Sequence, residues 1–499
     1  MPTIPRQTSP LRRIATLTPT VALMTLLAGC MVGPDYERPN LYVPATWSTA
    51  DGKTASRPAE LAYWWSTMKD PQLDSLIARA IEGNRSVAVA QARVREARAT
   101  LGEETGKLAP TLGGTSSVNR TKTAEVATTI GADDVFTQYR SGFDAGWEID
   151  LFGGKRRGVE AAKYGLDAAE EELRNTMLVL VGDVASNYAQ VRAAQARLAL
   201  GARTARSQRQ SAALTRAKLE GGSGTTADVA RAEALAASTE ADLPTYEIAR
   251  TSAVNRLGVL LGLPPATLSA ELSKSKPIPR PRITPAVGIP ADVLLSRPDV
   301  RLAERQLAQS TARIGASEAA RYPSVSLTGN IASSALHLSD IARSSTIGWA
   351  FGPALNVPLF RGGQLKSAVN VAEARRDQSF ATYEASVLTA MEEVENAIVS
   401  LSQQRRRSAK LASAVDAYRR ADAASRSQYE SGSLNYLDLL DGQRQLYTAE
   451  GALIESQLAV TNAYIALNKA LGGGWSGQRA PSGSLTKTTP VKVKTGTGS

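Results

Sequence analysis

Cysteine and histidine are almost missing from this sequence. Its 499 residues contain one of each, Cys30 and His337. A disulfide within the chain is therefore impossible, and sites that need a Cys/His pair or several His ligands are almost excluded. The sequence also shows no nucleophile–base pair and no phosphate-binding loop. We expect no catalytic residue, no cofactor and no metal site, and an enzyme is disfavoured.

Aromatic residues and long apolar runs are also scarce. Phe, Trp and Tyr make up 5% of the chain, while Ala is abundant. Small side chains allow close contacts between helices but fill a globular core poorly. Beyond residue 30, no apolar stretch is long enough for a transmembrane helix. A mature chain that spans a membrane must then do so with closed β-strands.

The charge is positive but dispersed. The formal net charge is +11, and Arg and Lys alternate with Glu and Asp along the helical stretches. Nucleic-acid binding needs basic residues gathered on one face, so we expect no nucleic-acid partner. The one dense basic run, Arg405-Arg406-Arg407, is read as a solvated helix face.

The sequence contains two copies of one pattern of motifs. The offset between matching motifs stays between 208 and 213 residues, which indicates one duplicated architecture rather than two unrelated domains. The matching pairs are 108–112 with 321–325, 151–154 with 359–363, Gly222-Ser223 and Asp228 with Gly432-Ser433 and Asp438, and Leu257, Leu261 and Gly262 with Leu467, Leu471 and Gly472.

The N-terminus has the pattern of a bacterial lipoprotein signal. A basic start is followed by the short apolar stretch 14–27 and by Leu27-Ala28-Gly29-Cys30. We interpret 1–29 as a signal peptide, Cys30 as the lipid attachment site and 30–62 as an extended, lipid-anchored arm. Met31 follows the cysteine, where an Asp would favour the inner membrane, so the pattern leans toward the outer membrane.

The first repeat is expected over 63–265. A helix runs from about 70 to 107, and strands are predicted at 111–121 and 136–150 from their alternation and turn signals. A helix over about 158–220 and its return to about 261 form a long hairpin, in which Pro244 should kink or break the second helix. Apolar residues spaced 4,3,4,3 give this hairpin a heptad seam; they are Leu173, Met177, Leu180, Val184, Val191, Ala194 and Leu198, with Asn187 as a polar interruption.

The second repeat, 291–472, follows the same plan. A helix is expected at about 291–320, strands at 324–334 and 346–359, and a hairpin of helices at about 363–430 and 436–471. The segment 266–290 is Pro-rich and is read as a linker, and 473–499 as a disordered tail. The heptad spacing recurs at Val387, Met391, Val394, Ile398 and Leu401.

This plan is incomplete in a single copy. The predicted fold is mainly α with a small β part, and four strands cannot close a sheet in lipid without unpaired backbone groups. Heptad helices with Ala-rich flanks likewise need neighbours on more than one side. Both features predict oligomerisation. Three subunits would supply a twelve-strand β-barrel and a twelve-helix tube.

Four motifs resemble the TolC-like outer-membrane factor family, in its lipoprotein (NodT-type) branch. The resemblance covers about residues 30–475, and the motifs together are highly specific. They are Val32-Gly33-Pro34-Asp35-Tyr36, Trp64-Trp65 with Asp70-Pro71-Gln72-Leu73, Trp147 to Gly153 (WEIDLFG) and Tyr436 to Asp441 (YLDLLD).

The resemblance implies a homotrimeric duct in the outer membrane that extends into the periplasm. Its expected partners are a periplasmic adaptor protein and an inner-membrane efflux pump, and its expected role is passive exit of small toxic compounds or drugs. An exit duct for type I protein secretion is the alternative. A purely structural coiled-coil lipoprotein is disfavoured because it leaves the strand-like segments beside Pro110 and Pro323 unexplained.

The resemblance also implies a pore gate at the tips of the hairpins. Leu437 and Asp441 match positions that form rings around the pore, and Asp438 matches a further acidic ring. Tyr429 matches a tyrosine that bonds an Asp of the first hairpin, here Asp228. For Asp228 and Asp438, stabilisation of a helix N-terminus is the competing interpretation. An Arg latch of some relatives is in doubt, because Leu434 stands at its place.

Overall fold

The computed structural model describes residues 31–44, 46–47, 62–122, 135–281, 293–294 and 296–474. The chain forms two compact units, and each unit draws on both repeats. The first contains the sheet with residues 303–383, 95–168 and the arm up to Pro39. The second contains most of the long hairpins. Neither repeat is therefore a compact body by itself.

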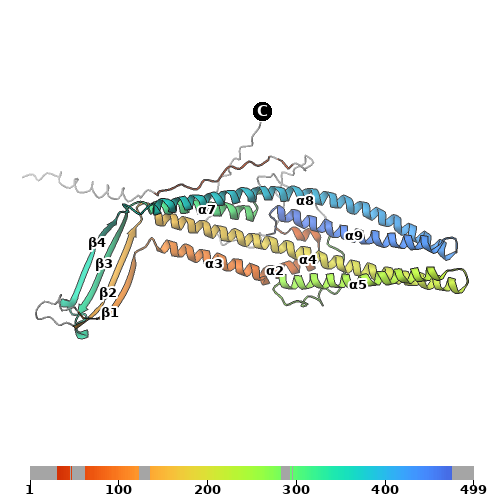
Figure 1. Cartoon of the computed structure of the whole chain (residues 1–499), viewed down its shortest axis with the longest axis horizontal. Coiled ribbons are helices and arrows are strands. Elements are labelled where there is room, and N and C mark those ends of the chain that lie inside the picture. Colours follow the sequence, from red (N-terminus) through yellow and green to blue (C-terminus); the bar gives the residue numbers. More distant parts are fainter. Residues whose placement is uncertain are drawn as a thin grey trace, which may run out of the picture. The chain divides into compact units, whose positions relative to one another are not determined.

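The first unit is built on a four-stranded antiparallel sheet in the order β1-β2-β3-β4 (Figure 1). Its strands are β1 (Thr111–Lys122), β2 (Val135–Ile149), β3 (Ser324–Ala335) and β4 (Ile347–Asn356). The expectation of four strands is confirmed. β4 ends three residues before the predicted end. Pro358 follows shortly after, and it has no backbone N–H with which to continue the ladder of hydrogen bonds.

The register sorts the side chains of the sheet onto two different faces. Directly opposed residues share a face, and Phe143 opposes Ile331, which in turn opposes Trp349. The resulting apolar face carries charge only at the end of β1, in Arg120 and Lys122. Most of its large side chains are exposed; among them are Leu112, Val118, Phe143, Trp147, Leu327, Ile331, Trp349, Phe351 and Leu355.

The opposite face of the sheet is polar and small. β1, β3 and β4 contribute only Gly, Ala, Ser, Thr and Asn to it, whereas β2 adds the larger side chains Phe136, Gln138, Arg140, Asp144 and Glu148. An exposed apolar face on a sheet this large is unfavourable in water and favourable against lipid. Within the described ranges, every helix lacks the length or the hydropathy of a membrane-crossing helix.

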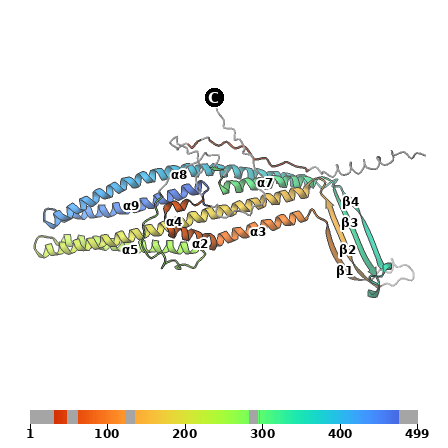
Figure 2. The same ribbon diagram turned by 180° about the vertical axis from the view of Figure 1, so that it is seen from behind.

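Most of the two helical hairpins lies in the second unit. α4 (Gly154–Glu220) turns back as α5 (Thr226–Leu260), and α8 (Gln364–Glu430) turns back as α9 (Tyr436–Ala470). Figure 2 shows each pair running side by side. The heptad seam explains the pairing, because Met177, Leu180, Val184 and Val191 of α4 are buried, as are Val387, Val394 and Leu401 of α8.

Three helices differ from the sequence-based expectation. The stretch 70–107 is two helices, α2 (Pro71–Gly83) and α3 (Arg85–Gly106), because the Asn84 side chain accepts hydrogen bonds from the backbone N–H groups of Ser86 and Val87. α7 is shorter than predicted and begins at Pro298. Of the kink or break expected at Pro244, the break is wrong: α5 continues through it, and the kink stays a prediction. Pro244 is exposed, so water can reach the carbonyl that loses its donor.

The largest apolar core of the second unit gathers around the 3-10 helix η2 (Trp64–Met68). Both tryptophans of η2 are buried, and the Tyr464 hydroxyl lies 2.7 Å from that of Thr67. Buried Arg192 donates to the side chain of Gln72 and to the backbone oxygen of Lys274. Residues far apart in sequence thus fix the roots of both hairpins.

Candidate functional site

The two hairpin tips have the same construction. Gly222 and Gly432 occupy the left-handed region, with φ of 76° and 82°. Each turn is closed by a serine backbone N–H, from Ser223 to Lys218 O at 2.8 Å and from Ser433 to Gln428 O at 2.9 Å. A side chain caps each return helix, through Thr225 in α5 and Asn435 in α9.

The first turns of α9 divide cleanly into a buried and an exposed side. Tyr436 and Leu439 are buried, whereas Leu437, Asp438 and Asp441 are exposed. Spacings of three and four residues place these exposed side chains on one strip of the helix. The Asp441 carboxylate accepts a hydrogen bond from the Gln445 side chain. The strip carries two acids and is directed away from the chain's own core.

The corresponding strip of α5 is electrically balanced. Asp228 occupies the position of Asp438, but Arg231 stands where α9 has Asp441. Arg231 lies 3.3 Å from the Asp228 carboxylate, which also accepts a 2.6 Å hydrogen bond from Thr225. Asp228 and Asp438 both lie in the first turn of a helix, as the capping interpretation requires. The excess acid at the tips therefore comes from the second hairpin.

Tyr429 joins the two hairpins through partners that the sequence did not indicate. Its hydroxyl lies 2.9 Å from the Thr215 hydroxyl, and Lys218 donates to its backbone oxygen at 2.5 Å. The Lys218 ammonium also sits 4.5 Å from the centre of the Tyr429 ring. Within one chain, Tyr429 bonds Thr215, whereas Asp228 bonds Thr225 and Arg231. A Tyr429–Asp228 contact between chains stays a prediction.

A second tyrosine, Tyr436, also packs at the contact between the two hairpins. Tyr436 packs edge-on against Tyr429, with ring centres 5.7 Å apart. Burial, together with nearby Tyr429 and Asp228, raises the pKa of Tyr436 to about 12. Leu434, at the place of the Arg latch, packs against the same cluster. The tip is thus held by apolar packing plus a few polar contacts.

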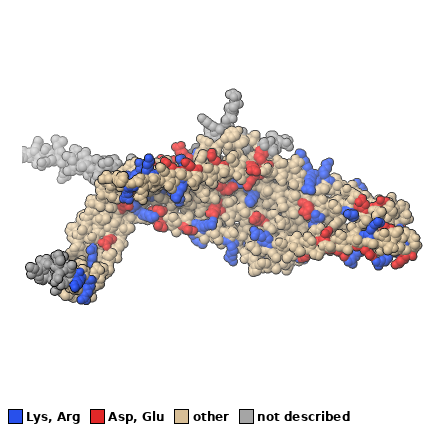
Figure 3. Space-filling view, in the orientation of Figure 1, with Lys and Arg blue, Asp and Glu red and all other residues tan. Residues whose placement is uncertain are grey.

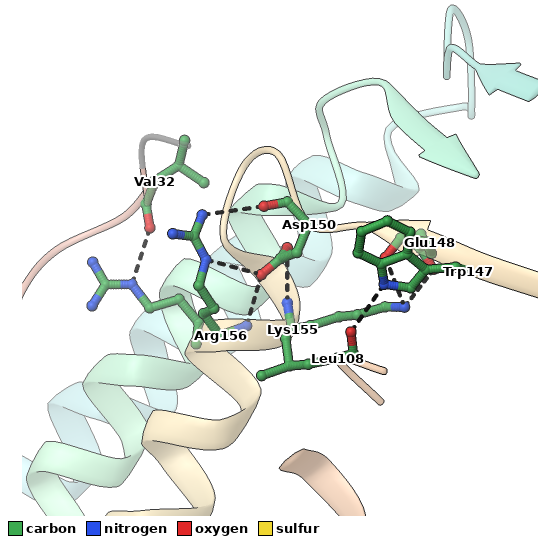
Figure 4. A network of polar contacts seen from close by, with 8 residues as sticks. Val32, Leu108, Trp147, Glu148, Asp150, Lys155 and Arg156 are labelled. Atoms are coloured by element: carbon green, nitrogen blue, oxygen red, sulfur yellow. Dashed lines mark hydrogen bonds and ion pairs between the residues drawn. The ribbon is translucent and has the colours of Figure 1, made fainter. Parts of the chain in front are cut away.

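A dense polar network marks the junction of β2 and α4 (Figure 4). The Asp150 carboxylate accepts from the backbone N–H groups of Lys155 and Arg156 and so caps α4. The Lys155 ammonium lies 3.3 Å from Glu148. The Trp147 indole donates to the Leu108 backbone oxygen at 2.9 Å, which ties the end of β2 to the start of β1.

Arg157 holds the N-terminal arm against this junction. It is 1% exposed and donates to the backbone oxygens of Val32 and Gly33 and to the Asp35 carboxylate. Burial alone would lower the pKa of Arg157, but its bonds to Glu160 and Asp35 raise it. Sequence reasoning missed Arg157, because its partners in the arm lie 122 or more residues away. Cys30 lies outside the described residues.

An antiparallel sheet with one apolar and one polar face, joined to paired long helices, defines an outer-membrane channel subunit. The family model described as outer membrane efflux protein matches residues 76–263 and 289–473, one stretch for each repeat. The chain belongs to this family.

Relatives and solved structures agree. The chain is 34% identical to the solvent efflux pump outer membrane protein SrpC of Pseudomonas putida, over 92% of this chain and 98% of the relative. It is also 34% identical to nodulation protein T of Rhizobium leguminosarum bv. trifolii, covering 90% and 96%. The structure of the outer-membrane channel OprN matches with a TM-score of 0.83 and 32% identity, over 89% and 100% of the two chains. The protein is an outer-membrane channel of an efflux system.

Proposed function

We propose that three copies of this chain assemble into a passive exit duct for small toxic compounds or drugs. The observation that carries the proposal is the sheet, whose outer strands β1 and β4 each pair on one side only within the described chain. Unpaired strand edges are not tolerated in lipid, so the edges must meet those of other copies. Closure would put the apolar face against lipid and the polar face around the passage.

The sequence predicts no site at which this chain could convert energy. We therefore propose that a separate pump supplies the energy for transport through the duct. We place it downstream of an inner-membrane efflux pump and a periplasmic adaptor protein. The P. putida relative is named for solvent efflux, which supports small organic compounds as the cargo. Type I protein secretion gains no comparable support from the relatives named above. Lipid attachment at Cys30 is part of the proposal.

The exposed strip of α9 is the proposed gate. Threefold symmetry would bring three copies each of Leu437, Asp438 and Asp441 around one axis. Carboxylates brought together in this way repel one another and attract cations, so a closed tip would favour cations and exclude large molecules. Because Arg231 offsets the acid of the first hairpin, the second hairpin supplies the net charge of these rings.

The gate is tested by conductance of purified channels in bilayers. Asp441→Ala should weaken cation preference and raise uptake of large antibiotics in cells several-fold. Asp416→Ala is the matched control, since Asp416 is an exposed acid on the neighbouring helix α8. Equal behaviour of the two variants would remove Asp441 from the gate.

Assembly and lipidation have separate tests. Cross-linking of outer-membrane fractions should trap trimers, and a strictly monomeric protein would contradict the duct. Cys30→Ser should abolish incorporation of labelled palmitate, whereas persistent labelling would contradict the lipid site. Membrane insertion can survive this change, because the strands carry their own apolar face.

A further inference from the structure

The corner between β2 and α4 is covered within the chain. Phe152 stacks on Tyr322, with ring centres 4.7 Å apart and planes 20° apart. Tyr322 directly precedes Pro323 and strand β3, which is the neighbour of β2 in the sheet. The Phe152 backbone oxygen also accepts a hydrogen bond from Val32 of the arm. The segment that follows β2 thus packs against the segment that precedes β3.

The matching corner between β4 and α8 is bare. Leu359 and Phe360 repeat Leu151 and Phe152, yet both are 90% exposed. No other large apolar side chain in the described chain reaches this exposure. Burying two adjacent apolar side chains of this size away from water is favourable. The second corner therefore lacks the cover that the first corner has.

The duplication indicates which segment would cover Leu359 and Phe360. Tyr322-Pro323 at the start of β3 corresponds to Ala109-Pro110 at the start of β1. β1 is the strand whose outer edge is also unpaired in the described chain. Within the chain, the last strand of the first repeat, β2, pairs with the first strand of the second repeat, β3. If the same pairing continues between copies, β4 pairs with β1 of another copy.

We propose that Leu359 and Phe360 dock onto the α3–β1 corner, Leu108 to Pro110, of a second copy of this chain. The inference rests on the proposed trimer but goes further, because it assigns the residues that join one subunit to the next. It also fixes the order of contacts around the assembly, with the second repeat of each copy against the first repeat of its neighbour.

The receiving corner suits this role. Its backbone is held by the Trp147 indole, which bonds the Leu108 oxygen at 2.9 Å. Ala109 and Pro110 are exposed, and Leu112 is 75% exposed on the apolar face. Ala109 stands where Tyr322 stands in the other corner, so the docking surface presents the small side chains of Ala and Pro in place of an aromatic ring. Leu112 and Phe351 share a sheet face by register, which keeps the apolar surface continuous across the junction.

The test uses two full-length chains with different tags in one cell. One chain carries Phe360→Cys, and the other carries Leu108→Cys, Ala109→Cys or Pro110→Cys. Mild oxidation of outer membranes should join the two tags in at least one of the three combinations. Chains without these changes give the background, since Cys30 is the only native cysteine. Leu338→Cys, in the loop between β3 and β4, replaces Phe360→Cys as the matched control and should give no mixed product.

The outcomes separate this inference from the trimer itself. Trimers that form without any mixed cross-link from position 360 would overturn the docking and leave the duct intact. A wild-type chain that stays monomeric would overturn both. As a second readout, Phe360→Glu should reduce the SDS-resistant trimer at least tenfold relative to Leu338→Glu; equal trimer yields would contradict the docking.

Discussion

The two repeats share one plan but differ in how they finish their corners. Both contain a 22-residue helix before two strands, α3 in the first repeat and α7 in the second. Their hairpins also have the same lengths, since α4 and α8 have 67 residues each and α5 and α9 have 35 each. The first repeat surrounds its strand–helix corner with Asp150, Arg157 and the arm. The second repeat has Pro358 and Ser367 at these two positions. The duplication preserved the geometry, whereas the polar contacts diverged.

This difference separates contacts made within the subunit from contacts that we propose for the assembly. The first corner is covered within the chain, so its residues act on the stability of the single subunit. The second corner exposes Leu359 and Phe360, which the proposed docking would bury against another copy. The tips diverge in a parallel way, with Arg231 in the first hairpin and Asp441 in the second.

The largest expected effect concerns Arg157. Arg157→Ala removes the donor to Val32, Gly33 and Asp35, and should cost about 3 kcal/mol of unfolding free energy because it breaks a buried, charged network. The arm should also become sensitive to protease. Denaturant unfolding and limited proteolysis measure the two effects. Ser367→Ala, at the same place in the second repeat, should change neither; an equal loss would end the distinction between the corners.

The glycine turns at the two hairpin tips test a place where the two repeats have the same construction. Gly222→Ala and Gly432→Ala each force a side chain into the left-handed region, at a cost of about 1–2 kcal/mol. Nothing lies within 4 Å of a Cβ at either position, so no clash adds to this cost. Hydrogen exchange at the tips should report similar losses. Clearly unequal losses would mean that the tips differ in more than their side chains.

A smaller effect is expected at Trp147. Trp147→Phe removes the hydrogen bond to the Leu108 oxygen and should cost about 1 kcal/mol. Trp349→Phe removes an indole that is 70% exposed on β4 and serves as the control. Thermal unfolding in detergent measures both. The comparison fails if the two variants lose the same stability.

The smallest effect appears only at high pH. The pKa of Tyr436 rises from 10.0 to about 12 in the folded chain, so its contribution to stability is complete below pH 10 and is lost as the pH rises through about 12. Tyr436→Phe should remove this part of the alkaline loss and leave neutral pH almost unchanged. Thr226 occupies the same place in α5, so Thr226→Ala should leave the alkaline profile as it is. Identical profiles for wild type and Tyr436→Phe would contradict the role of this hydroxyl.

Periodic features were predictable from the sequence. The hairpins follow from the 4,3 spacing, and the strands follow from alternation and from turn residues, because both patterns act over a few neighbouring residues. The helix break at Asn84 was missed, although an Asn followed by a helix is a capping signal. The effect of Pro244 was overestimated, because exposure to water cannot be read from the residue alone.

The polar contacts were predictable only in part. Asp228, Asp438 and Tyr429 were singled out through resemblance, and the positions of Asp228 and Asp438 in the strips follow from helical spacing. Thr215 and Lys218 were missed as partners of Tyr429, because more than 200 residues separate them from it. Contacts of this kind depend on how the hairpins pack, and no local pattern reports that.

The polar face of the sheet gives the proposed passage an uneven wall. Its charged residues, Arg140, Asp144 and Glu148, all come from β2, and the other three strands present short neutral side chains. In a threefold assembly these charges would form three ribs, separated by broad neutral panels. A cargo molecule could then move along a neutral panel by exchanging hydrogen bonds among short Ser, Thr and Asn side chains, without meeting a fixed charge.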